Sequence, residues 1–466
     1  MNYLKSIWFT LGLLYFISGC VYTYKEIKFI KWQKDLLLIS YARLMYCFTF
    51  GFIPASLCFM YSTLDIEVKL KTLVVVDYSY DGLVALFFFW IFSVIGYIML
   101  NIGYKNIYVL KYGNTKLLSK NNHKITEMQS FTIAAICLIV GGISLYLWTL
   151  NEGNVFNFII KANWYRGDST NAMNNPYAML RVPSRILELA TFLFFFYLIN
   201  NNTKHKLLYF IGYFWGVALS ILYLLCIDGR LEIALFLGMQ VIGLVLYRHK
   251  KVNITKRKIY EVSTIAFFAL FLISQLDNIT YYIRYGAENG IDTNPSESFY
   301  IILMNEFAYI YETGQMAIQT NIFDSGKWML IDDIVRGFFS CFPSKFTPDG
   351  FERVWRWNTY LCTGSRLSAT IPCDIISESI YDLSVFGPFV IPFLFGTMVR
   401  QVEVYFSDVK SRPFYRACYI FLALAFFRII NYCELYDFMR GMFSFCVMWI
   451  VYLFVVRLSL KNRMKG

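Results

Sequence analysis

The chain has 466 residues, of which 58% are hydrophobic and only 16% are charged. A water-soluble domain needs more charged side chains to cover its surface, so this composition excludes an ordinary globular protein. The formal net charge is +12, but the basic residues lie in short loops between apolar runs and form no separate basic domain, which argues against a nucleic-acid partner.

Apolar runs that are long enough to cross a bilayer follow one another along the chain. A spanning helix needs about 20 mostly apolar residues, and these runs are apolar on every face, unlike the alternating strands of a membrane barrel. We therefore predict an all-α polytopic membrane protein with about 11 transmembrane helices, in the range of roughly 10–12. The predicted spans are 6–23, 35–60, 83–100, 131–150, 186–200, 207–227, 231–248, 259–276, 385–404, 415–431 and 442–458.

The first two spans each have a feature that bears on topology. The run 7–22 lacks a basic segment before it and a clear cleavage site of small residues, so we interpret it as a retained helix and not as a signal peptide. The span 35–60 is long and contains Arg43, so we expect it to be tilted or broken.

Lysine-rich loops alternate with lysine-poor ones, and this alternation sets the predicted orientation. All the lysine-rich segments fall on one side of the chain's path, which the positive-inside rule identifies as the cytoplasmic side. The C-terminus is then cytoplasmic and the N-terminus lies outside. The lysine-rich segments are 24–34, 101–130, 204–206, 248–258, 410–416 and 461–465.

Three segments lie on the opposite, outer side. They are a medium loop at 151–185, a tight turn at 228–230 and a large extracytoplasmic loop at 277–384. The last has about 100 residues, too many for a plain connector. Its apolar stretches 298–310 and 331–342 have helical spacing and predict short helices at the membrane surface.

This organisation divides the chain into three parts of one integrated membrane domain. Residues 1–276 form an N-terminal transmembrane bundle, 277–384 the large outer loop and 385–466 the C-terminal transmembrane helices.

The outer segments carry many arginines, whereas the cytoplasmic loops mostly use lysine. A guanidinium presents a planar fork of donors that matches phosphate or carboxylate oxygens, so the group predicts an anionic ligand. An ion pair with a neighbouring carboxylate or a lipid headgroup is the alternative for each single arginine. The selected residues are Arg181, Arg185, Arg230, Arg284, Arg353, Arg356, Arg366 and, near the outer end of its span, Arg428.

Local context sharpens some of these choices. Arg181 and Arg185 are four residues apart just before a span, although Glu188 is placed to neutralise Arg185. Arg230 follows Gly229 in a tight turn at headgroup depth, where a snorkelling arginine is equally expected. Arg353 and Arg356 flank Trp355, a pattern that suits sugar or phosphate contacts and equally an interfacial aromatic belt.

Carboxylates precede the late span with helical spacing. Asp374, Glu378 and Asp382 are four residues apart and share a helix face if this segment is helical. A carboxylate there suits a general base acting on a sugar hydroxyl, and a solvent-facing charge or an ion pair is the alternative. Cysteines also occur in the predicted outer loops, where their pairing stays open: Cys341, Cys362, Cys373 and Cys433.

Several kinds of site are not supported by the sequence. The three histidines all fall in predicted cytoplasmic loops, and no glycine-rich phosphate loop occurs. No metal-ligand spacing is visible either. We therefore expect no metal and no cofactor.

Short motifs and the layout of the whole chain resemble the Wzy-type O-antigen polymerases, which polymerise oligosaccharide repeat units in the bacterial envelope. The motifs are GR at 229–230 opening a span, TGSR at 363–366, IISESIY at 375–381, FG at 386–387 and FLFG at 393–396.

The resemblance implies a fold similar to the GT-C-like membrane glycosyltransferases, in the inner membrane and with the large loop in the periplasm. It implies a metal- and nucleotide-independent enzyme that moves a glycan from undecaprenyl pyrophosphate onto another lipid-linked repeat unit, with membrane lipid and a chain-length regulator as further partners. Glu378 and Arg230 would then be catalytic, with Glu378 as the base. The remaining arginines selected above and Asp374 would bind substrate.

Two other functions compete with this interpretation. A repeat-unit flippase or other transporter is the leading alternative, although no internal repeat is evident and a loop of about 100 residues is unusual for one. An O-antigen ligase has a similar layout, but that family relies on a histidine in the large outer loop, and this chain has none there.

Overall fold

In the computed structural model, all the regular secondary structure of the described residues is helical, with no strand among them. This confirms the predicted all-α class. The described residues are 2–33, 37–64, 76–105, 125–162, 175–227, 229–247, 264, 308–342, 346, 348–365, 371–406 and 412–463.

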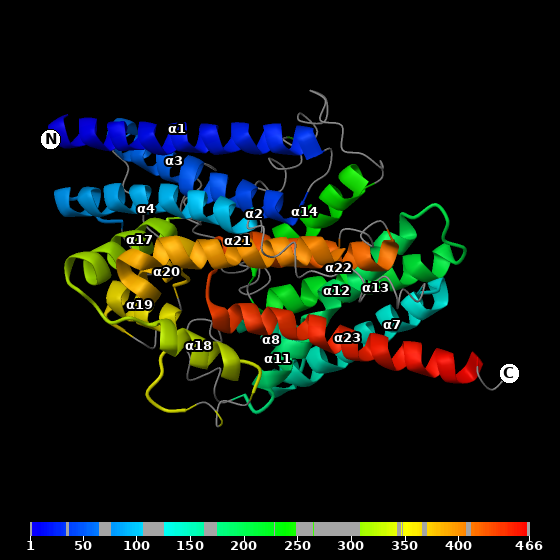
Figure 1. Cartoon of the computed structure of the whole chain (residues 1–466). Coiled ribbons are helices and arrows are strands. Elements are labelled where there is room, and N and C mark those ends of the chain that lie inside the picture. Colours follow the sequence, from blue (N-terminus) through cyan, green and yellow to red (C-terminus); the bar gives the residue numbers. More distant parts are fainter. Residues whose placement is uncertain are drawn as a thin grey trace, which may run out of the picture.

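The helices used below follow one another in the order shown in Figure 1. They are α1 (Asn2–Gln33), α2 (Leu38–Cys47), α3 (Ile53–Phe59), α4 (Tyr80–Tyr104), α7 (Glu127–Thr149), α8 (Val155–Ile160), α11 (Arg181–Ser184), α12 (Ile186–Leu198), α13 (Lys206–Cys226), α14 (Arg230–Tyr247), α17 (Tyr309–Ile318), α18 (Leu330–Phe339), α19 (Val354–Thr363), α20 (Ile375–Leu383), α21 (Gly387–Phe406), α22 (Pro413–Ile429) and α23 (Leu435–Arg463).

Seven helical stretches of the described chain are long and apolar enough to cross a membrane, as a polytopic membrane protein requires. Of the other predicted spans, 186–200, 231–248 and 415–431 coincide with the shorter helices α12, α14 and α22. The predicted span 259–276 lies outside the described residues except for Thr264, so the count of about 11 stays a prediction. The seven stretches are Tyr3–Gln33, Leu38–Thr63, Tyr80–Tyr104, Glu127–Glu152, Lys206–Cys226, Ile375–Phe406 and Leu435–Arg457.

The second span was expected to be tilted or broken, but in the structure it is one continuous helical stretch, Leu38–Thr63. A π-helical turn at Phe48–Phe52 joins α2 to α3, another at Met60–Leu64 follows α3, and each widens the helix locally. The charge that the span carries is neutralised inside the protein, because Arg43 Nη1 lies 3.2 Å from Glu26 Oε2 of α1. The guanidinium also lies 4.7 Å from the Phe29 ring centre. Arg43 is therefore a structural residue that joins α1 to α2.

The long helices share one general direction, and the short helices of the large loop gather at one end of them. In Figure 1 α17, α18, α19 and α20 lie toward the left, where α1 begins, and α23 runs from beside α18 to the C-terminus at the right. α4 packs on α21, and α12 packs between α7, α13 and α22. We refer to the left end as the loop end of the bundle.

Of the two short helices predicted in the large loop, 331–342 is confirmed as α18, whereas 298–310 lies outside the described residues except for its last three. α18 exposes Ile331, Ile334 and Phe338, as a helix on a membrane surface does. By contrast, α17 and α20 are buried along almost their whole length. α20 also continues into α21 as one spanning stretch, so the membrane segment begins about ten residues before the predicted 385. The start of α20 can be buried because the Asp374 side chain accepts hydrogen bonds from backbone N–H groups that would otherwise have no partner.

A short turn between α22 and α23, residues 430–434, is contacted from many parts of the chain, and we call it the closing turn. The backbone N–H of Ile375 donates to the Ile430 carbonyl (3.0 Å), and that of Cys433 donates to the Cys373 carbonyl (2.9 Å). Thr49 of the π-helical turn hydrogen-bonds Asn431. The closing turn therefore fixes the start of α20 against the end of α22.

The contact between α4 and α21 depends on glycines that admit no side chain. A Cβ added at Gly103 would lie 2.1 Å from the Phe393 carbonyl oxygen, whereas one added to Gly238 of α14 would meet nothing within 4 Å. We expect Gly103→Ala to destabilise the protein by roughly 2 kcal/mol or more through overpacking. Gly238→Ala should instead be neutral or stabilising by up to about 1 kcal/mol, because alanine favours helix. Thermal unfolding of both variants in detergent tests this, and equal melting temperatures would contradict it.

Candidate functional site

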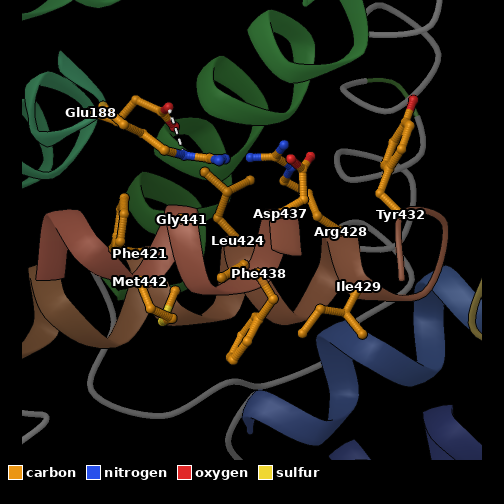
Figure 2. Close-up of a pocket in the computed structure, with 12 residues that line it drawn as sticks. Glu188, Phe421, Leu424, Arg428, Ile429, Tyr432, Asp437, Phe438, Gly441 and Met442 are labelled. Atoms are coloured by element: carbon orange, nitrogen blue, oxygen red, sulfur yellow. Dashed lines mark ion pairs between the residues drawn. The ribbon is translucent and has the colours of Figure 1, made fainter. Parts of the chain in front are cut away.

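Two of the selected arginines line one pocket at the loop end of the bundle. Arg185 and Arg428 come from the start of α12 and the last turn of α22, and the pocket is partly open to its surroundings. Figure 2 shows Arg428 with Asp437 and Tyr432 among the residues that line it. The full lining is Arg185, Glu188, Phe421, Leu424, Ala425, Arg428, Ile429, Tyr432, Asp437, Phe438, Gly441 and Met442.

A carboxylate from a third helix joins the two arginines. Glu232, in the first turn of α14, accepts a hydrogen bond from Arg428 Nη2 through Oε1, and its Oε2 lies 3.7 Å from Arg185 Nη2. Arg185 Nε also lies 3.5 Å from Glu188 Oε1, so the neutralising partner proposed from the sequence is present. These ion pairs fix both guanidinium groups at the pocket wall.

The arginines keep donors free for a ligand. Each guanidinium has five N–H bonds. Within the described part of the chain, Arg185 Nη1 and the Nε and Nη1 atoms of Arg428 make no hydrogen bond or ion pair. The side chains are only 15% and 11% exposed. Donors that are fixed in direction and partly shielded from water bind anionic oxygens well.

Asp437 of α23 lines the same pocket and was not selected from the sequence. Its carboxylate makes no hydrogen bond or ion pair with the residues that the structure describes, although it lies near enough to Arg185 and Arg353 to stabilise their charge. The one available signal was an acidic residue in the first turn of the last span, just after a span that ends in Arg428. Among the residues that line the pocket, Asp437 is thus a carboxylate without a described ion-pair partner.

The other selected arginines are distributed as follows. Arg181 is exposed at the start of α11 and does not line the pocket. Arg230 begins α14, two residues before Glu232, and its side chain lies outside the described part of the structure. Arg284 and Arg366 fall outside the described residues altogether.

Arg353 belongs to a second, buried group of charges. Its Nε donates to Glu434 Oε1 (3.1 Å), its Nη2 donates to Oε2 of the same carboxylate, and the guanidinium lies 4.0 Å from the Tyr436 ring centre. Burial works against its charge, but Glu434 outweighs burial and raises the Arg353 pKa. Burial and the nearby Arg353 lower the pKa of Arg356 instead. Arg353 is thus occupied by an ion pair.

Three further carboxylates lie beside this pair. Ligand oxygens of Asp333, Glu378 and Asp382 all lie within 4.8 Å of one another, and the three residues are buried. We call them the acidic cluster. Burial, and after it the charge of Glu434, raises the pKa of Asp333. Glu378 and Asp382 lie together as predicted, whereas Asp374, predicted on the same face, is the N-cap that precedes the helix. Asp333 of α18 joins the two from outside the motif.

The structure gives no support to Glu378 as the base. Its side chain is 1% exposed and does not line the pocket that holds Arg185 and Arg428. Helical spacing showed which carboxylates share a face, but it did not show that this face points into the protein. A base must reach its substrate's proton, so the burial of Glu378 does not favour this role, which stays a prediction.

Asp374 is also engaged structurally. Its Oδ1 accepts hydrogen bonds from the backbone N–H groups of Ile376 (2.8 Å) and Ser377 (3.0 Å), and its Oδ2 accepts one from the Ser377 hydroxyl (2.5 Å). These bonds cap the start of α20. They leave little of the carboxylate for a substrate, so the geometry favours a cap over the predicted substrate contact.

All the outer-loop cysteines are free thiols in the structure, so none of the four is paired. Burial raises the pKa of Cys362 and of Cys373, which makes both poor nucleophiles.

Glu312 of α17 is a buried carboxylate away from the acidic cluster. Burial, and after it the charge of Asp77, raises the pKa of Glu312 to about 7. A raised carboxyl pKa favours the neutral form in the folded state, so stability is greatest below the unfolded pKa and is lost as pH rises toward 7. Glu312→Gln should therefore melt close to the wild type at pH 5 and several degrees higher at pH 8. The exposed Asp349→Asn should show no such divergence, and parallel pH profiles for all three proteins would refute this.

Comparison with known proteins found no match: no family model, no curated protein and no solved structure is significantly similar to this chain.

Proposed function

We propose that this chain is a membrane glycosyltransferase that polymerises undecaprenyl-pyrophosphate-linked oligosaccharide repeat units into O-antigen or a related surface polysaccharide, at the periplasmic face of the bacterial inner membrane. The observation that carries the proposal is the pocket in which Arg185 and Arg428, from different helices, present free N–H donors beside the unpaired carboxylate of Asp437. The short motifs that resemble the polymerases point the same way.

The pocket has the parts that glycosyl transfer from a lipid pyrophosphate requires. The hydroxyl oxygen of the acceptor sugar attacks the anomeric carbon of the donor glycan, and the bond from that carbon to the phosphate oxygen breaks. Undecaprenyl pyrophosphate leaves with the bonding electrons, and Asp437 takes the hydroxyl proton. Fixed N–H donors of Arg185 and Arg428 stabilise the charge that develops on the leaving phosphate.

The carboxylates around the arginines orient them and do not prevent anion binding. Glu188 and Glu232 together neutralise the two guanidinium groups, so the pocket offers directed donors and not a large positive charge. Arg181 lies exposed at the start of α11 and forms no ion pair with the residues described, so its positive charge offsets the negative charge of Asp437. Directed N–H donors with little net charge suit a diphosphate whose negative charge is also balanced by groups outside the pocket.

The position of the pocket suits a substrate with an apolar tail. The starts of α12, α14 and α23 and the end of α22 bring the charged residues to one end of the bundle. At that end the glycan and pyrophosphate of a lipid-linked sugar can reach the pocket while the prenyl chain stays among the helices or in the bilayer.

Deletion of the gene in its native host, followed by gel electrophoresis of the cell's lipopolysaccharide, tests the proposal. A polymerase predicts collapse of the ladder to a core that carries a single repeat unit, restored by the wild-type gene. Loss of even the single repeat would point to a flippase or a ligase and would reject the polymerase. An unchanged ladder would reject a role in this glycan.

A further inference from the structure

The acidic cluster contains three buried carboxylates, and no cationic side chain in the described part of the chain forms an ion pair with them. Asp333, Glu378 and Asp382 are 6%, 1% and 2% exposed, and none of them forms an ion pair within the described part of the chain. The nearby cations are already engaged, because Lys327 pairs with Asp332 and Arg353 pairs with Glu434. Leaving uncompensated charges in such a place is costly, so some other positive species belongs there.

Some carboxylate oxygens of the acidic cluster have no hydrogen-bond partner among the described residues. Neither Glu378 Oε1 nor Oε2 accepts a conventional hydrogen bond from the described residues, and the weak thiol donor of Cys373 is what lies against it. Asp382 Oδ1 is also buried without a partner. Asp333 uses Oδ1 to accept the Leu435 N–H at 3.2 Å. A buried carboxylate with both oxygens unmet is rare in folded proteins and calls for a ligand.

We propose that Asp333, Glu378 and Asp382 bind one divalent cation of the oxygen-preferring class, Ca2+, Mg2+ or Mn2+, which holds α18 against α20. Oxygens within 4.8 Å of one another fit around one such ion, because metal–oxygen distances are about 2.0–2.6 Å. All donors are carboxylate oxygens, which these hard cations favour over Zn2+ or Cu2+.

Protonation of the three carboxylates would compensate their charge less well than a bound cation. A protonated carboxyl becomes a donor that needs its own acceptor, and it leaves its remaining oxygen unmet. One divalent ion satisfies lone pairs on three side chains together and cancels most of their charge. Burial and neighbouring carboxylates raise the pKa of Asp333 when no cation is bound, and a bound cation would lower it again.

The cation has a structural role and lies outside the transfer chemistry. None of its three ligands lines the pocket of Arg185, Arg428 and Asp437. It connects α18, which exposes an apolar face, to α20, which continues into the spanning helix α21. The inference therefore stands apart from the proposed function, and its test needs no transferase assay.

The test is Mn2+ binding to the purified full chain in detergent, followed by electron paramagnetic resonance and elemental analysis after removal of free metal. We expect one Mn2+ per chain, competed by Ca2+ or Mg2+, and a rise in melting temperature when Ca2+ replaces a chelator. Glu378→Gln and Asp382→Asn should each weaken Mn2+ binding by at least about 10-fold. Glu312→Gln, which alters a buried carboxylate outside the acidic cluster, should bind as the wild type does.

Absence of a stoichiometric Mn2+ in the folded wild type would overturn the proposal and leave protons as the compensating species. Mn2+ binding that survives unchanged in both Glu378→Gln and Asp382→Asn would overturn it as well. The wild-type measurement decides the matter even when a variant fails to fold, because it requires no variant.

Discussion

Replacing Arg428 by alanine should reduce polymer synthesis about 100-fold, so that the lipopolysaccharide ladder shrinks toward a single repeat. Removing one fixed donor to a developing oxyanion costs roughly 100- to 1,000-fold in rate. Arg428 holds Glu232 and offers two further nitrogens to the pocket, so its loss removes both a donor and the bridge to Arg185. The measurement is the ladder in a deletion strain that carries the variant gene.

Companion variants separate this effect from misfolding. Arg428→Lys keeps the charge but loses the planar fork, so we expect it to recover only a small part of the activity. Asp437→Asn should stop transfer while the protein remains folded, because the amide cannot accept the proton. Arg400→Gln is the matched control, since Arg400 is a partly buried arginine that stacks on Tyr104 far from the pocket. A normal ladder from a well-expressed Arg428→Ala protein would remove the pocket from the mechanism.

Replacing Arg353 by methionine should destabilise the protein by about 3–5 kcal/mol, the usual result of removing one partner from a buried ion pair. Glu434 would be left as an unpaired buried carboxylate close to the acidic cluster. Both nitrogens that Arg353 gives to Glu434, and its stacking on Tyr436, would be lost together. Thermal unfolding in detergent measures the effect, which should shrink at low pH as Glu434 takes up a proton.

The exposed ion pair between Lys161 and Glu152 serves as the comparison for the buried pair of Arg353 and Glu434. Lys161 lies 2.5 Å from Glu152, but its side chain is 41% exposed, so Lys161→Gln should cost less than about 1 kcal/mol. The double variant Arg353→Met/Glu434→Gln should recover much of the lost stability, because no unpaired charge remains. If Arg353→Met melted no lower than Lys161→Gln, the buried pair would not be important for stability.

Much of the fold was predictable because the length and the apolar composition of a segment are enough to identify a membrane helix. The length of the second span and Arg43 suggested a tilted or broken helix, whereas the structure has one continuous stretch with two π-helical turns. The early start of the late span was not predicted either, because residues 375–383 contain Glu378 and Asp382, and a hydropathy window assigns such residues to a loop. In the structure these carboxylates face other carboxylates inside the protein, and no sequence window contains that information.

The assembly of the pocket could not be predicted from residue type. The sequence selected Arg185 among the arginines of the predicted outer loops and Arg428 as an ionisable residue near the end of a span, and the structure brings the two into one pocket. Which carboxylate accompanies them depends on helices that are distant in the sequence, so Asp437 was missed. Spacing placed Glu378 and Asp382 on one face, but only packing shows that Asp333 meets them there.

The closing turn has a consequence for the order in which the chain matures. Residues 430–434 are made after several of the segments that contact them, including Thr49 of the second span and the start of α20. Because chains are synthesised from the N-terminus, α17 to α20 emerge from the ribosome without the partner that fixes them. Arg353 cannot form its ion pair until Glu434 has been made, and Asp333 cannot accept its hydrogen bond until Leu435 has been made. Biogenesis of the loop end is thus a late event, completed only when the final pair of helices enters the membrane.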